Sequence, residues 1–294
     1  MYCTGRGIFC IKKKKSSKEV IRLDIMSRRK EKREIMKKKL NKEVPGGKVV
    51  FSKRRILLSL FLFLIAAIIG VKLCGEAEKE RKEEKRYEQI RRKKDSENKK
   101  LKKMYPDMVG WIEVKDSTFS YPVMQTKEVP EYYLNRNEKG DYSFYGTPFL
   151  DARCDMDSDQ LLIYGHNING RRFFGFLHNY QEQSFYEKNK NLYFTRVDET
   201  EETYPIVAVI KTDVYSDYFK NTSIYNDEQY FQFVEEMVAE SLYPCEGADI
   251  LKKDMKEDTV EAFFHKYQFL TLATCRTTEG KNKRLLVIGC RRKT

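Results

Sequence analysis

Histidine is scarce in this chain, with three copies among 294 residues: His166, His178 and His265. No combination of these with the seven cysteines has the spacing of a metal site, so the sequence argues against zinc chemistry and we expect no cofactor. The odd number of cysteines argues against a complete disulfide framework. One bridge, between Cys154 and Cys245, is left open.

Acidic residues are scarce in the first 55 residues, which carry 5 Asp or Glu against 20 Lys or Arg. The rest of the chain carries 39 acidic against 37 basic residues, so the net charge of +13 belongs to an N-terminal arm, residues 1–55. Nucleic-acid binding is one explanation of such an arm. Beside a membrane span, topology and attraction to anionic lipid explain it better, and we expect no nucleic-acid partner.

The chain has one long apolar run, residues 56–71. It is shorter than the roughly 20 residues that span a bilayer, but basic residues at both ends can snorkel. A buried core helix is the alternative, although such a helix is rarely apolar all round. We therefore expect residues 56–74 to form a transmembrane anchor, with a cytoplasmic N-terminus and an extracellular remainder. No small-residue cleavage site follows, so we expect the anchor to be retained.

The remainder divides into residues 75–104 and residues 105–294. The first part is charge dense, which indicates a charged tether or a solvated helix. The second part is mainly β, because short apolar runs alternate with turn residues, and this indicates a closed barrel. The expected strands are residues 110–114, 121–125, 161–164, 191–195, 204–210, 269–274 and 284–290.

Two helical inserts are expected between these strands, at residues 173–180 and 227–242. The second has apolar residues at helical spacing. Asn226 and Gln229 are placed as its N-cap and the N3 partner of that cap. Its apolar stripe is explained most simply by core packing.

The last two expected strands bring a thiol beside a fixed cation. Cys275 ends the apolar run of residues 269–274, and a polar stretch separates it from Arg284, which opens the final strand. If the two strands pair, Cys275 and Arg284 face each other about 5 Å apart. The guanidinium is always charged, so it can favour a thiolate or donate hydrogen bonds to an oxyanion. His166 also follows a strand end, and the three groups suffice for acyl transfer.

The motifs around these residues, Thr-Leu-Ala-Thr-Cys at 271–275, Tyr-Gly-His-Asn at 164–167 and the order His, Cys, Arg, resemble the sortases, the cysteine transpeptidases of Gram-positive surfaces. The resemblance covers about residue 105 to the C-terminus and implies a sortase-type barrel of about eight strands. Ala273 departs from the serine that class B members often carry there. Features typical of class B are residues 110–112, 121–123, 132–134, 149–151 and 169–170, and a long insert before the Cys275 strand.

The resemblance implies a membrane-anchored transpeptidase that acts on secreted proteins with a C-terminal sorting signal. Cys275 would attack the carbonyl of a threonine in that signal and form a thioester. His166 would exchange protons with the departing and incoming amines, and Arg284 would stabilise the oxyanion or hold the substrate. The implied acceptor is an amine of a peptidoglycan precursor or of a pilin. The residues that we expect to contact the substrate are Asn167, Ala273 and Thr274.

Several alternatives remain open. Transfer to a cell-wall amine is the main expectation, and a pilin-polymerising sortase is the first alternative. A surface protein with the same barrel that is inactive, or that releases its thioester to water, is a further alternative. A papain-like peptidase is the weakest, because those enzymes place the cysteine before the histidine, opposite to the order here.

Overall fold

The computed structural model describes residues 30–34, 36, 53–168, 172–198, 200–220, 222–224, 226–275, 280 and 282–293. The side chains of residues 53, 55, 95–99, 168, 172 and 275 are not described. Most of the expected basic arm, residues 1–55, and the Asn169-Gly170 pair therefore lie outside the described residues. The chain divides into two units, residues 1–73 and 74–294, which are described separately.

The described part of the first unit is dominated by helix α2 (Lys53–Met104), which continues into the second unit. The large apolar side chains of residues 56–73 are all exposed. Among the described residues, one helical stretch, 56–94, is long and apolar enough to cross a membrane. By its length and composition, this stretch is consistent with the expected anchor.

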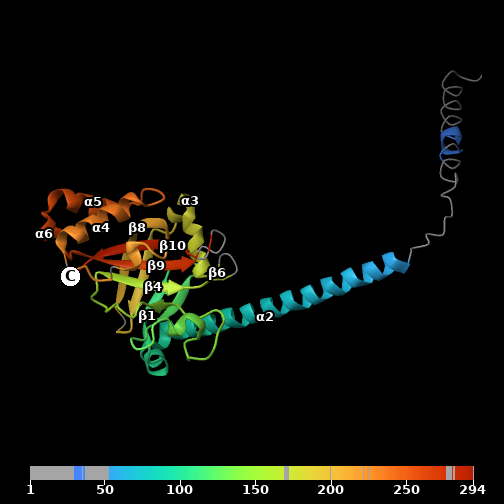
Figure 1. Ribbon diagram of the computed structural model, residues 1–294, viewed down its shortest axis with the longest axis horizontal. Coiled ribbons are helices and arrows are strands. Elements are labelled where there is room, and N and C mark those ends of the chain that lie inside the picture. The colour runs from blue at the N-terminus through green and yellow to red at the C-terminus, as the bar shows by residue number, and fades with distance from the viewer. Residues whose placement is uncertain are drawn as a thin grey trace, which may run out of the picture. The chain divides into compact units, whose positions relative to one another are not determined.

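The second unit is built around a closed barrel of eight strands, in the spatial order β1-β2-β3-β4-β9-β10-β8-β7 (Figure 1). Neighbours are antiparallel except for β2 with β3 and β4 with β9. The predicted barrel and its seven predicted strands are confirmed. Of the barrel strands only β3 was not expected, since two residues show no periodicity, and the two short strands outside the barrel, β5 and β6, were not expected either. The strands are β1 (Met108–Glu113), β2 (Ser120–Met124), β3 (Phe149–Leu150), β4 (Gln160–Gly165), β7 (Asn191–Arg196), β8 (Glu201–Asp213), β9 (Tyr267–Cys275) and β10 (Lys283–Arg292).

Several helices lie between the barrel strands in sequence, and a small hairpin follows β4. In Figure 1, α4, α5 and α6 gather on one side of the barrel, while α3 and β6 lie on the other. The hairpin pairs β5 (Asn167–Ile168) with β6 (Arg172–Phe173). The helices of the second unit, besides α2, are η1 (Tyr132–Asn135), η2 (Phe174–Gln181), α3 (Gln183–Tyr186), η3 (Asp217–Phe219), α4 (Asp227–Ala239), α5 (Ala248–Glu257) and α6 (Val260–Phe263).

Helix α4 begins as predicted and ends early. The Asn226 side chain accepts a hydrogen bond from the Gln229 backbone N–H at 2.9 Å, so the predicted N-cap is confirmed. The helix stops at Ala239 rather than residue 242, because the Leu242 N–H donates to the Val209 carbonyl of β8 at 2.8 Å. The other predicted insert is a 3₁₀ helix, η2, and helices α5 and α6 were not expected.

The second half of α2 packs against the barrel. Ile90 and Leu101 are buried in one apolar cluster with residues such as Trp111, and burial of each aliphatic side chain is worth about 1.5–3 kcal/mol. Arg86 forms ion pairs with Glu83 on the helix and with the fully buried carboxylate of Glu138. Residues 75–104 are therefore helical, but the helix packs on the barrel and is not the solvated helix that was one of the two alternatives.

Replacing Arg86 by Met should lower the unfolding free energy of residues 74–294 by about 3 kcal/mol, because the Glu138 carboxylate would lose its cation. Burial already raises the pKa of Glu138. The double variant Arg86→Met/Glu138→Gln should recover most of the loss. Urea unfolding followed by circular dichroism measures both. An unchanged midpoint in the single variant, or a double variant that is no more stable, would contradict this account.

Candidate active site

Three neighbouring strands, β4, β9 and β10, end or begin at one rim of the barrel, toward which the arrowheads of β4 and β9 point in Figure 1. Cys275 pairs with Arg284 across β9 and β10, so this prediction is confirmed for the backbone. Gly165 pairs with Thr274 across the parallel strands β4 and β9. His166 is one residue further along the same register, which places its backbone beside that of Cys275, because adjacent strands are about 4.8 Å apart. The Cys275 side chain lies outside the described residues.

The glycine before His166 lets another segment approach closely. A β-carbon at Gly165 would lie 2.3 Å from the ring of Phe174, the first residue of η2. No side chain fits there unless that ring moves. The strand end that carries His166 is thus held against η2.

The His166 imidazole is largely enclosed. Its Nε2 atom is buried and has no hydrogen-bond partner among the described residues. Burial lowers the pKa of His166 below its ordinary value of 6.5, and the Leu134 backbone carbonyl opposes this with a smaller effect. A buried polar atom without a partner needs an explanation, and transfer of a proton to or from a substrate is one.

Arg284 is the second residue of β10 and is partly exposed. Its Nη1 atom donates to the Lys283 carbonyl at 3.0 Å. Its backbone is paired on both sides, with Cys275 of β9 and with Thr212 of β8. The cation is therefore carried by a central strand, which restricts its backbone.

Comparisons with known proteins point to one family, although no family model matches the chain. Sortase B of Staphylococcus aureus (strain NCTC 8325 / PS 47) is 26% identical over 249 residues, which cover 79% of this chain and 94% of that protein. Sortase B of Listeria monocytogenes serovar 1/2a (strain ATCC BAA-679 / EGD-e) is 28% identical over 198 residues, 64% of this chain and 70% of that protein. A 2.0 Å crystal structure of S. aureus sortase B matches 72% of this chain and all of its own with 25% identity and a TM-score of 0.60.

The chain is a sortase, most like class B. It is therefore a cysteine transpeptidase, as predicted from its motifs. The barrel, its strand order and the long insert between β8 and β9 agree with this assignment.

The other described thiols of this sortase are poorly suited to attack. Cys154, Cys245 and Cys290 are buried and free, so the bridge left open between the first two is absent. Burial raises their pKa values to about 12, 11 and 12 respectively, which keeps them protonated at neutral pH. Cys74 is exposed but lies on α2, near the end of the apolar run. Within the described ranges, no three His, Cys, Asp or Glu residues form a group that could hold a metal ion.

The three expected substrate contacts differ in their surroundings. The Asn167 Nδ2 atom lies 2.9 Å from His178 Nε2, so this amide helps to join the hairpin to η2. Ala273 and Thr274 are buried in the barrel wall, with 2% and 1% of their surfaces exposed. The Thr274 hydroxyl has no hydrogen-bond partner within the part of the chain that the structure describes. Contact of these residues with substrate stays a prediction.

Two neighbours of the site were not anticipated as such: the Leu134 carbonyl beside His166 and the Phe174 ring beside Gly165. Leu134 lies in η1, more than thirty residues upstream of the histidine. Its only signal in the sequence was the resemblance of residues 132–134 to class B members. A main-chain carbonyl carries no residue-type signal, so pattern alone does not find it.

In the Cys275→Ala variant, where no thiolate can couple to it, His166 should titrate with a midpoint below 6.5, because burial disfavours the imidazolium. Since the folded-state pKa lies below the unfolded one, the folded protein binds fewer protons, and stability falls as pH drops through 6.5. NMR of the ¹³C-labelled histidines measures the midpoint, and His166→Gln assigns the signal. A midpoint above 6.5 would refute the prediction.

Proposed function

We propose that this sortase is a membrane-anchored enzyme that cleaves a C-terminal sorting signal after threonine and transfers the acyl group to a cell-wall amine. The observation that carries the proposal is the pairing of Cys275 with Arg284, next to the pairing of Thr274 with Gly165, the residue directly before His166. The S. aureus relative has been solved as a sortase B–substrate complex, which supports a peptide-like substrate here.

The first half of the reaction forms the thioester. The Cys275 thiolate adds to the threonine carbonyl, and the oxyanion of the tetrahedral intermediate is stabilised by the Arg284 guanidinium. The carbon–nitrogen bond then breaks, and the imidazolium of His166 gives its proton to the departing amine. The enzyme is left with an acyl group on sulfur and a neutral imidazole.

The second half transfers the acyl group. The incoming amine attacks the thioester carbonyl while His166 takes a proton from its nitrogen. The carbon–sulfur bond breaks, the amide forms, and the thiolate and imidazolium are restored. The same residue thus acts as acid and then as base, which requires an Nε2 atom that is not committed to another hydrogen bond.

The reactive ion pair is a minority form of the enzyme. A free thiol has a pKa of about 8.5, whereas burial keeps the pKa of His166 below 6.5. Because burial favours the neutral ring and a free thiol is mostly protonated at neutral pH, thiolate and imidazolium together are the less populated form. Arg284 increases that fraction, because a fixed positive charge near the sulfur favours the thiolate.

The apolar part of α2 is the proposed anchor. Its exposed apolar side chains need a non-aqueous environment, and the basic residues before it favour a cytoplasmic N-terminus. The catalytic unit would then face the cell wall, where secreted proteins with sorting signals and an amine acceptor, from a peptidoglycan precursor or a pilin, are its partners.

Cys275→Ala should lower amide formation about a thousandfold or more, because no other described thiol is placed to form the acyl-enzyme. The full chain in detergent is incubated with peptides that carry candidate sorting signals and with triglycine, and products are identified by mass spectrometry. An amide product indicates transfer, and cleaved acid alone indicates a hydrolase.

The matched control is Cys290→Ala, which removes a buried thiol from the neighbouring strand. This variant should keep amide formation. Turnover that survives in Cys275→Ala would defeat the assignment of the nucleophile, and cleaved acid alone from the unaltered enzyme would favour the hydrolytic alternative.

A membrane-impermeant maleimide should label Cys74 on intact cells, because this exposed thiol follows the apolar run directly. The experiment uses the Cys275→Ala background, and peptide mapping locates the label. Cys74→Ser should abolish it. Labelling of Cys3 or Cys10 instead, or label that appears only after lysis, would reverse the proposed topology.

A further inference from the structure

One residue of α2, Tyr87, touches two separate segments that flank His166. It lies on the charged part of the helix, outside the barrel sequence, and its side chain is buried. Burial raises the pKa of Tyr87 to about 12, so the hydroxyl stays protonated and able to donate. The first segment runs from Leu134 to Gly146, and the second is the hairpin that begins at Asn167.

The first contact is a hydrogen bond. The Tyr87 hydroxyl donates to the Gly146 carbonyl at 2.8 Å, in a buried position. Gly146 has a φ of +61°, and a β-carbon there would lie 2.3 Å from the Leu134 carbonyl oxygen. The same carbonyl influences the pKa of His166. One hydrogen bond and one close backbone contact therefore connect α2 to the group beside the imidazole.

The second contact is between aromatic rings. The Tyr87 ring meets Phe173 edge-on, with centroids 5.7 Å apart. Phe173 pairs with Asn167, the residue after His166. Its φ of +50° is unusual for a bulky side chain, and such strain persists only where the surroundings fix it.

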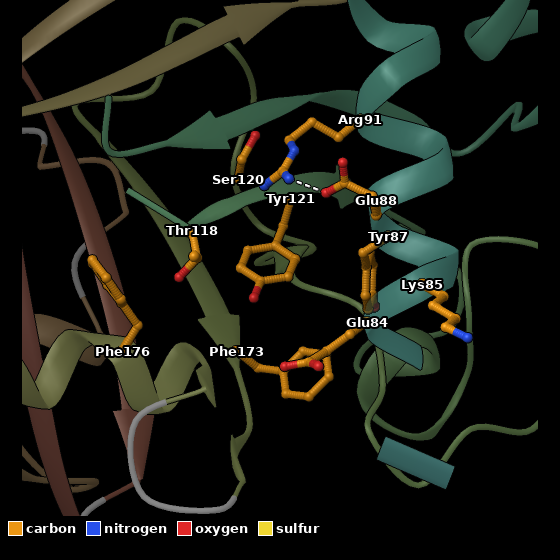
Figure 2. Close-up of a pocket in the computed structure, with 10 residues that line it drawn as sticks. All are labelled: Glu84, Lys85, Tyr87, Glu88, Arg91, Thr118, Ser120, Tyr121, Phe173 and Phe176. Carbon is orange, nitrogen blue, oxygen red and sulfur yellow. Dashed lines mark hydrogen bonds and ion pairs between the residues drawn. The ribbon is translucent and has the colours of Figure 1, made fainter. Parts of the chain in front are cut away.

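Phe173 also borders open space. Figure 2 shows Tyr87, Tyr121 and Phe173 around a cavity of about 450 Å³ between α2 and the barrel. Three rings pack on Phe173, those of Tyr87, Tyr121 and Tyr145. Because the cavity offers Phe173 room to move, loss of the Tyr87 ring would allow the strained hairpin to relax.

We propose that Tyr87 is a positioning residue for His166, which holds the Leu134 carbonyl on one side and the Asn167–Phe173 hairpin on the other. Through this one residue, α2 supports the placement of His166 and also links the barrel to the proposed anchor. The inference rests on the proposed role of His166, but the placement of the imidazole can be tested without turnover.

The test uses the full chain in detergent micelles, with Tyr87→Ala and Tyr87→Phe compared with matched changes in the same apolar cluster, Leu101→Ala and Tyr105→Phe. Tyr87→Ala should lower kcat for amide formation about tenfold or more, with less effect on KM, because a misplaced catalytic group slows chemistry. Tyr87→Phe, which loses the hydrogen bond alone, should lower kcat about threefold. The control variants should stay near the unaltered enzyme.

The second measurement is the NMR titration of His166 in the same variants, each combined with Cys275→Ala so that no thiolate couples to the imidazole. In Tyr87→Ala its midpoint should rise towards 6.5, because burial is the larger of the two influences on it. Tyr87→Phe keeps the ring, so it replaces the alanine variant in both measurements if that variant does not fold.

Equal losses in the Tyr87 and control variants, with an unmoved midpoint, would show a purely structural role and overturn the proposal. Unchanged kcat and midpoint in both Tyr87 variants would overturn it as well. If the unaltered enzyme forms no amide with any peptide, the proposed function fails, while the titration still decides the role of Tyr87.

Discussion

The site depends on the register of β9 with its two neighbours. On one side β9 is parallel to β4, and on the other it is antiparallel to β10, so that a distant segment of the chain shares one rim with the β9–β10 hairpin. A slip of one residue in a strand turns its side chains to the opposite face. Such a slip in β4 or β10 would remove His166 or Arg284 from the surroundings of Cys275. The buried faces of these strands make such a slip costly, so the hydrophobic core also protects the chemistry.

Much of this arrangement was predictable from sequence, for physical reasons that differ between elements. The β9–β10 hairpin is predicted by two apolar runs that flank a polar stretch containing Gly280. The φ of Gly280 is +122°. The parallel pairing of β4 with β9 is not predictable in this way, because no local pattern encodes contact between segments about a hundred residues apart. There the family resemblance supplied what periodicity cannot. Helix α4 was predicted from its apolar stripe and Asn226 cap, but its end was misplaced because a tertiary hydrogen bond to β8 decides it.

The second half of α2 shows the opposite limit. Its charge density suggests exposure to solvent, and its buried apolar positions among the described side chains are only three, Tyr87, Ile90 and Leu101. Charged residues here do not imply exposure, since Arg86 holds the buried Glu138 and Lys94 lies 2.8 Å from Glu113 of β1. Pairing of opposite charges lets a polar helix dock on a barrel without leaving a buried charge uncompensated. Composition reports the charges but not their partners, so it cannot distinguish such a helix from a tether.

The enclosure of His166 has opposing consequences. Burial holds its pKa below 6.5, which makes the neutral base easy to form and the imidazolium scarce. An exposed imidazole would be charged more often, but water would compete for the nitrogen that, in the proposed mechanism, exchanges protons with the two amines. The Leu134 carbonyl moderates the cost, because it favours the charged ring from one side while Nε2 stays without a partner. Any element that fixes this carbonyl therefore adjusts the balance between acid and base, and the proposed role of Tyr87 would make α2 such an element.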